Sequence, residues 1–158
     1  MQSLMKGLGE YYLVEGVRFE YKDLPGSRKK LIKAFKKKLV KEIFGIVSNK
    51  RAHNVIDDGV KISIRFTRRG IDHFCNDVLL TLSGMYFDEE SMKSIDTILS
   101  NANYVQTSHE KIHYRTDGRD LWFAYLDSEG RGVYFKVCFN KNIKGYEFYS
   151  AEKELKIK

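Results

Sequence analysis

The sequence has little cysteine, proline or tryptophan, with two, one and one of these residues among its 158. Cys75 and Cys138 are too few for the disulfide framework of a small secreted domain, so a reducing compartment is the default expectation. No apolar run approaches the roughly 20 residues that cross a bilayer. The N-terminus also lacks the apolar segment of a secretion signal. We therefore expect a cytoplasmic protein with no membrane partner.

The sequence also lacks the short motifs of several enzyme classes. There is no P-loop, no GxGxxG and no GxSxG pattern, which argues against nucleotide-binding folds and serine hydrolases of the common types. No CxxC pair occurs, and His109 and His113 fall on a predicted loop and strand rather than on one helix face. We therefore predict neither a metal site nor a cofactor.

Positive charge is abundant. The chain carries 28 Lys and Arg against 21 Asp and Glu, for a formal net charge of +7. A basic surface favours polyanionic partners such as RNA, DNA or an acidic protein. The length predicts a single domain, residues 1–158, and the hydrophobic fraction of 42% suffices for a real core.

The stretch Glu110–Ala151 predicts four β-strands joined by short turns. The turn signals are Asp117-Gly118, Ser128-Glu129-Gly130 and Asn140-Lys141-Asn142, because Gly and Asn tolerate positive φ. The runs between them are rich in aromatic and β-branched residues. Connections this short make neighbouring strands antiparallel. The fold class predicted is α+β, with a C-terminal antiparallel sheet of four or more strands packed against two or three helices.

Alternation along these strands assigns two faces. One face carries an apolar row in the third strand: Val133, Phe135, Val137 and Phe139. The other face carries polar side chains from several strands: Lys111, His113, Arg115, Tyr134, Lys136, Glu147 and Tyr149. If the strands align, this polar row forms one surface that could hold a ligand.

Other elements precede this sheet. They are two short strands or one bent strand in 11–21, a helix from Ser27 to about Val47, a hairpin in 54–66, a short helix carrying His73, and a helix from Glu89 to about Asn101 capped by Asp88. We expect the helices near 27–47 and 88–101 to pack against the sheet. The helix after Ser27 is strongly basic and includes Lys36, Lys37 and Lys38. Its basic face is either a solvated surface or a surface that follows phosphates. Membrane-surface binding is less favoured, because its apolar face has no Trp.

The order of elements from Val60 to Ala151, with the phrases RRGIDHF, ILSNANYV and GYEFYS, resembles the barnase–EndoU–colicin–RelE (BECR) nuclease domains of phage polyvalent proteins and polymorphic toxins. Residues 1–50 lie outside the resemblance and form an N-terminal extension. The resemblance implies a metal-independent ribonuclease that acts on RNA, often tRNA, in the cytoplasm of a host or target cell. It also implies an immunity or antitoxin protein as a partner. It supplies no fixed catalytic motif.

Metal-free RNA cleavage needs a base for the ribose 2′-hydroxyl, an acid for the leaving oxygen and a cation at the phosphorane. Histidine suits both proton roles. The candidates are His73 and His113 for proton transfer, Lys136 or Arg115 for charge, and Tyr149 as a hydrogen-bond donor. Lys36, Lys37, Lys38, Lys111 and Tyr134 are candidates for RNA binding.

Each candidate also has a structural interpretation. His73 lies next to Phe74 and could be an ordinary hydrogen-bonded helix residue, and Lys136 could be exposed or paired instead of functional. A second function therefore stands beside the ribonuclease. It is a non-catalytic, phage-encoded protein that uses a basic face to bind nucleic acid or a host defence protein.

Overall fold

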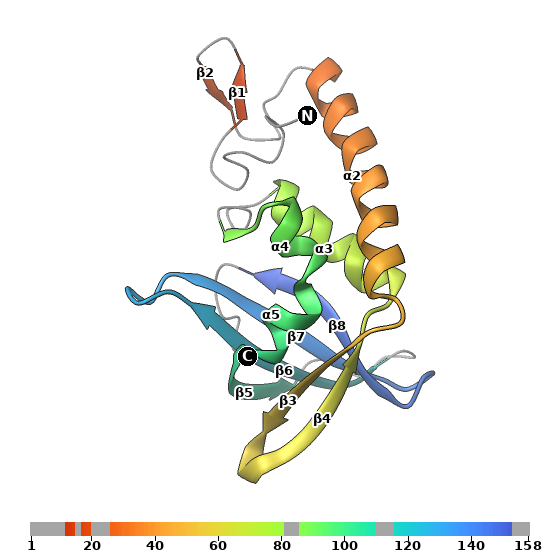
Figure 1. The fold of residues 1–158 in the computed structure, drawn as a ribbon, viewed down its shortest axis with the longest axis vertical. Coiled ribbons are helices and arrows are strands. Elements are labelled where there is room, and N and C mark those ends of the chain that lie inside the picture. The colour runs from red at the N-terminus through yellow and green to blue at the C-terminus, as the bar shows by residue number, and fades with distance from the viewer. Residues whose placement is uncertain (1–11, 15–16, 20–25, 81–85, 110–115, 153–158) are drawn as a thin grey trace.

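The computed structural model describes residues 12–14, 17–19, 26–80, 86–109 and 116–152 (Figure 1). The helices are α2 (Gly26–Val47), α3 (Arg68–Leu80), α4 (Glu89–Lys93) and α5 (Ile95–Ser100). The strands are β1 (Tyr12–Val14), β2 (Val17–Phe19), β3 (Arg51–Ile56), β4 (Val60–Arg65), β5 (Asn103–His109), β6 (Thr116–Leu126), β7 (Gly132–Asn140) and β8 (Gly145–Glu152). The α+β prediction is confirmed. Of the two alternatives for 11–21, the structure has two short strands, which pair with each other.

A six-stranded sheet has the order β3-β4-β8-β7-β6-β5. Strands β5 to β8 form the expected antiparallel meander at the C-terminal end. The sheet as a whole is mixed, because β4 and β8 run parallel where Ile64 pairs with Tyr146 and Arg65 with Glu147. The predicted C-terminal antiparallel sheet of four strands is thus confirmed for β5 to β8, but the complete sheet is not purely antiparallel. Parallel neighbours need a long crossover connection, and short turns in the sequence give no sign of one.

The first strand of the meander differs from the prediction. Strand β5 takes that place, and β6 runs through Asp117-Gly118 with a register shift before Asp120. Gly118 has φ +87°, so it serves a bulge inside a strand and not a hairpin turn. A glycine with positive φ suits both a hairpin turn and a bulge, so the sequence pattern could not distinguish them and the predicted turn at this position was wrong. Residues 110–115 lie outside the described residues, and with them the candidates Lys111, His113 and Arg115.

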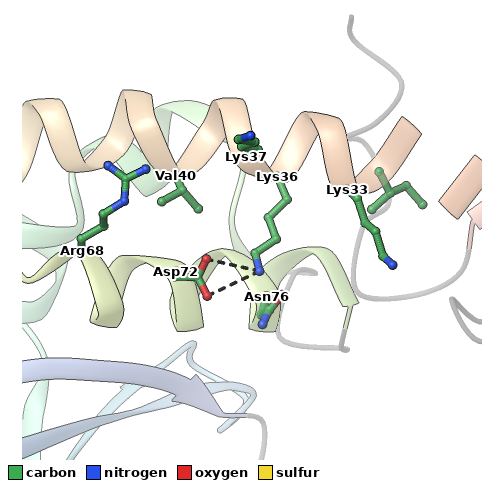
Figure 2. Close-up of a pocket in the computed structure, with 8 residues that line it drawn as sticks. Lys33, Lys36, Lys37, Val40, Arg68, Asp72 and Asn76 are labelled. Atoms are coloured by element: carbon green, nitrogen blue, oxygen red, sulfur yellow. Dashed lines mark hydrogen bonds and ion pairs between the residues drawn. The ribbon is translucent and has the colours of Figure 1, made fainter. Parts of the chain in front are cut away.

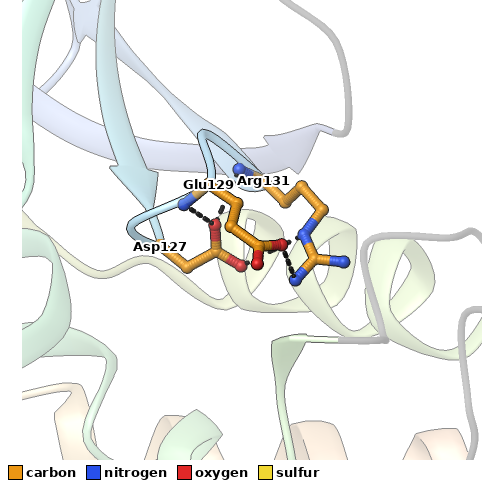
Figure 3. Close-up of polar contacts among 3 residues, drawn as sticks. All are labelled: Asp127, Glu129 and Arg131. Atoms are coloured by element: carbon orange, nitrogen blue, oxygen red, sulfur yellow. Dashed lines mark hydrogen bonds and ion pairs between the residues drawn. The ribbon is translucent and has the colours of Figure 1, made fainter.

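The other turns follow the sequence. The β3–β4 hairpin closes through a 3₁₀ turn at Asp57–Gly59. Between β6 and β7 the carboxylate of Asp127 accepts the amides of Glu129 and Arg131, both at 2.9 Å (Figure 3). The Arg131 side chain also pairs with Asp127 and Glu129. The amide of Arg131 is the main reason that the pKa of Asp127 lies below its usual value.

The helices form layers on one face of the sheet. Helix α3 lies directly on β8, and α2 packs on the outside of α3 (Figure 1). The prediction that the helices near 27–47 and 88–101 cover the sheet therefore missed the main covering helix, which is α3. Its contact with β8 is close, since a Cβ on Gly70 would lie 2.0 Å from the carbonyl oxygen of Phe148.

The predicted helix from Glu89 to Asn101 is broken at Ser94 into α4 and α5. Its start is as predicted, because the Asp88 carboxylate accepts the Ser91 amide at 2.7 Å and the Ser91 hydroxyl accepts the Asp88 amide at 2.8 Å. Helix α2 begins at Gly26, one residue before the predicted start at Ser27.

One apolar core joins these layers. Leu39, Val40, Ile43 and Val47 from α2 belong to the same buried cluster as Phe74, Phe135 and Phe148. The sheet curls so that its two edge strands approach each other, and the Tyr104 hydroxyl of β5 donates to Asp57 at 3.3 Å. None of the helices in the described part of the chain has the length and apolar character to cross a bilayer.

Candidate functional site

Helix α3 presents three stripes, because residues four apart share a helix face. Ile71, Phe74, Cys75, Val78 and Leu79 are buried in the core. A second stripe, Arg69, His73 and Asp77, lies over β8, where Asp77 accepts the amide of Ala151 at 2.9 Å. A third, Arg68, Asp72 and Asn76, faces α2. The two polar stripes define two neighbouring candidate surfaces.

The first surface is centred on Tyr149, which occupies a bulge in β8. Lys136 pairs with Ser150 and Val137 with Phe148, so Tyr149 is an extra residue without a partner position on β7. A bulge redirects the side chain that it carries. Simple alternation along β8, on which the predicted polar row rested, therefore stops at this point.

Three functional groups surround the Tyr149 ring, and we call these four residues the Tyr149 cluster. The His73 ring stacks on it with centroids 4.5 Å apart and planes at 29°. The Arg69 guanidinium carbon lies 5.2 Å from the ring centroid, and Lys136 Nζ lies 5.1 Å from it. All four residues are half-buried. The fold thus brings together three predicted catalytic residues, His73, Lys136 and Tyr149.

Lys136 is held by a buried acid. Its Nζ lies 3.6 Å from Asp120 Oδ2, and the side chains of Lys136 and Asp120 are only 13% and 5% exposed. Cys138 donates its thiol to the same carboxylate at 3.2 Å, and burial raises the pKa of that thiol far above its usual range. Cys138 is therefore a buried structural residue. Lys136 has both a structural partner and a position beside His73.

The environment of His73 favours its neutral form. Burial lowers its pKa below 6.5, and the positive charge of Arg69 lowers it further, while Asp72 acts in the opposite direction. At neutral pH the imidazole can therefore accept a proton. A neutral histidine beside two cations is the combination that proton abstraction near a phosphate requires.

The second surface is a groove between α2 and α3, which we call the cationic groove (Figure 2). Its volume is about 300 Å³, and it is lined by Ile32, Lys33, Lys36, Lys37, Val40, Arg68, Asp72 and Asn76. Lys36 forms an ion pair with Asp72 at 3.3 Å, which ties the two helices together. Lys33, Lys37 and Arg68 make no ion pair with any residue in the described ranges, so their charges remain available to an anion.

The three consecutive lysines do not form one surface. Lys36 and Lys37 line the cationic groove, whereas Lys38 lines a separate hollow of about 490 Å³ beside α4, together with Glu42 and Glu89. Successive helical residues point about 100° apart, so a run of three necessarily spreads around the helix. Lys38 therefore shares a hollow with two acids and Lys93, and does not lie beside Lys36 and Lys37 in the groove.

The remaining candidates lie elsewhere. Tyr134 is half-buried on β7, where it pairs with Ala124 and Glu152. Two residues of the site were missed in the sequence, Arg69 and Asp120. Arg69 could have been found from its spacing of four residues before His73 on the same helix. Asp120 gave no local signal, because it lies on β6 and its partner Lys136 lies on the neighbouring strand β7.

Within the described ranges, no group of three or more His, Cys, Asp and Glu side chains is placed to hold a metal ion. Comparison with known proteins adds no relative: no family model, no curated protein and no solved structure matches this chain.

Proposed function

We propose that the chain is a metal-independent endoribonuclease whose reaction centre is the Tyr149 cluster. The observation that carries the proposal is the convergence of His73, Arg69 and Lys136 on one tyrosine ring. These residues come from a helix and two strands, so the grouping is a product of the tertiary fold. It supplies a base and two phosphate-binding cations.

In the proposed reaction, neutral His73 takes the proton of a ribose 2′-hydroxyl, and the resulting oxyanion attacks the adjacent phosphorus. Lys136 and Arg69 stabilise the charge of the pentacovalent phosphorane. The 5′-oxygen then leaves with a proton from the acid, which is His113 or the Tyr149 hydroxyl. The products are a 2′,3′-cyclic phosphate and a 5′-hydroxyl.

The cationic groove gives the RNA a path to this centre. Arg68 in the groove and Arg69 in the cluster are consecutive residues of α3 whose side chains leave the helix about 100° apart, so a backbone held by Lys33, Lys37 and Arg68 would turn around α3 to reach His73. The proposal includes the BECR family, RNA or tRNA as substrate, an immunity protein as a partner and action in the cytoplasm of a host or target cell. These parts rest on the resemblance of the sequence.

The test is cleavage of a labelled RNA in EDTA under single-turnover conditions. We expect cyclic phosphate ends, and a rate that falls about 10²–10⁴-fold in His73→Ala. The acid limb of the pH profile should have its midpoint below 6.5, because the pKa of His73 is lowered. His109→Ala is the matched control, since this exposed histidine lies on β5, three strands from β8.

A substrate with sulfur in place of the 5′-bridging oxygen shows which residue acts as the acid and which as the base. Its thiolate leaves without protonation, so the reaction no longer needs the acid. This substrate should restore the rate of whichever variant, His113→Ala or Tyr149→Phe, lacks the acid. It should not restore His73→Ala. Full activity in His73→Ala would refute the assignment.

The second candidate function is the non-catalytic binding protein. Its supporting observation is that Lys136 is nearly buried and already paired with Asp120, as expected of a structural residue. If the wild-type protein binds RNA or a defence protein in this assay without cutting RNA, this alternative is established and the proposed ribonuclease activity is refuted.

A further inference from the structure

The β3–β4 hairpin has one face that the proposed reaction does not use. This face carries Arg51, His53, Lys61 and Arg65, which we call the basic hairpin face. All four residues are exposed, as are Val55 and Ser63 between them. Side chains on one face of a strand recur about every 6.7 Å, so the three cations Arg51, Lys61 and Arg65 extend over roughly 13 Å of the ribbon.

Arg51 and Arg65 are directly opposite each other across the two strands. The amide of His53 donates outward to Ser100 Oγ at 3.0 Å and not to β4. The pairs on this face are therefore of the non-hydrogen-bonded kind, with Cα atoms about 4.5 Å apart. Like charges at such positions destabilise a sheet. The fold holds two guanidinium groups close together.

Nothing in the described part of the chain neutralises these charges, since none of the three cations Arg51, Lys61 and Arg65 has an ion pair there. The acid in register with Arg65 is Glu147 on β8, which is 2% exposed and accepts the side-chain amide of Asn140. Asp57 lies at the hairpin turn and accepts the Tyr104 hydroxyl. The basic hairpin face is thus complementary to an external anion.

The opposite side of the hairpin is fixed to the core. Ala52 and Ile64 are fully buried, and the Asn54 side chain donates to the carbonyls of Leu99 and Ala102, both at 2.9 Å. A ribbon held in this way presents its cations with little further loss of backbone freedom on binding. Figure 1 shows the hairpin extending away from α2 and α3.

The registers place Lys136 of the Tyr149 cluster on the same side of the sheet as this face. Arg65 pairs with Glu147, and Glu147 pairs with Cys138, so the three side chains share a face. Lys136 is two residues from Cys138 and lies on the same face. Cys138 and Glu147, which lie between Lys136 and Arg65 on this face, are buried, so the hairpin is a binding surface set apart from the cluster.

We infer that the basic hairpin face is a second binding site for the phosphodiester backbone of RNA, which positions the strand beyond the cleavage point. The inference rests on the proposed function for the identity of the ligand. An extended polyanion fits better than a single phosphate, because the cations lie along two strands and do not converge on one point.

The test is the binding of a short, labelled 2′-O-methyl RNA, which cannot be cleaved, measured by fluorescence anisotropy over a range of salt. In Arg51→Gln/Arg65→Gln we expect the slope of log affinity against log salt to fall by about 1.4, at roughly 0.7 per lost phosphate contact. At about 0.1 M salt this corresponds to ~25-fold weaker binding. Arg51→Lys/Arg65→Lys should keep most of the slope, because lysine still binds phosphate as a point charge.

The matched control is Lys38→Gln/Arg131→Gln, which removes the same charge from exposed positions outside the cationic groove and outside the β3–β4 hairpin. If Arg51→Gln/Arg65→Gln binds RNA as this control does, the inference is overturned. If polyglutamate of equal charge displaces the RNA as well as unlabelled RNA does, the face belongs to an acidic protein partner and the RNA assignment is also overturned.

The experiments distinguish a failure of the catalytic proposal from a failure of the hairpin site. Wild-type protein that binds the modified RNA through the hairpin but leaves ordinary RNA intact removes only the catalytic proposal. Cleavage with an unchanged salt slope in the double variant removes only the hairpin site. Absence of RNA binding by the wild-type chain removes both.

Discussion

Gly70→Ala tests the contact on which the Tyr149 cluster depends. Gly70 lies in the first turn of α3, one position after Arg69 and three before His73. A Cβ there would lie 2.0 Å from the carbonyl oxygen of Phe148, which is backbone and cannot rotate away. The helix must therefore move away from β8 by about 1 Å or more to reach ordinary contact distance.

The expected cost follows from two opposing effects. Alanine favours a helix over glycine by about 1 kcal/mol. Overpacking against a fixed group costs about 1–3 kcal/mol and occasionally more, and a contact this short belongs at the upper end. The net loss should be near 2 kcal/mol, which for a chain of this size lowers Tm by roughly 4–8 °C.

Gly45→Ala is the matched control, because Gly45 is inside α2 and a Cβ there would meet nothing within 4 Å. It should stabilise the protein by about 0.5–1 kcal/mol through helix propensity alone. Thermal and urea denaturation of both variants measure the difference. The displacement should also separate His73 from Tyr149, so any RNA cleavage should fall about 10²-fold in Gly70→Ala. Gly70→Ala with wild-type or higher stability would refute the close packing of α3 on β8.

Two further predictions concern named polar contacts. Asp88→Ala should cost about 1 kcal/mol by removing the cap of α4. The Ser91 amide lowers the pKa of Asp88, so the stabilisation is complete above the unfolded pKa of about 3.9 and disappears as pH falls through the lower folded value. Urea denaturation should show the gap from wild type closing at acidic pH, and a gap that persists there would contradict the capping role. Asp120→Asn should cost about 3 kcal/mol, because Lys136 loses its buried counter-charge. Lys136→Met should recover part of that loss in the double variant, and strict additivity of the two changes would show that the pair does not interact.

The local structure of this protein could be predicted from its sequence. Apolar spacing gave the long helix α2, and alternation assigned Val133, Phe135 and Val137 to the core, where all three are fully buried. The hairpin at Asp57–Gly59 and the cap at Asp88 were also predictable. These features depend on side chains within a few residues of one another, so their chemistry can be read along the chain.

Strand pairing, strand irregularities and helix breaks were determined by the tertiary structure. The parallel pairing of β4 with β8, the bulge at Tyr149 and the break at Ser94 left no signal in the local pattern. A bulge adds one residue to one strand, and its position depends on the packing of both strands and not on the residue itself.

The same reason limited prediction of the site. Residue chemistry picked out His73, Lys136 and Tyr149, but only the packing of α3 on β8 places His73 against Tyr149. Asp120 emerged only from the register between β6 and β7, which sets it beside Lys136. Contacts between residues far apart in sequence are fixed by the packing of the whole core, and the chain order does not contain them.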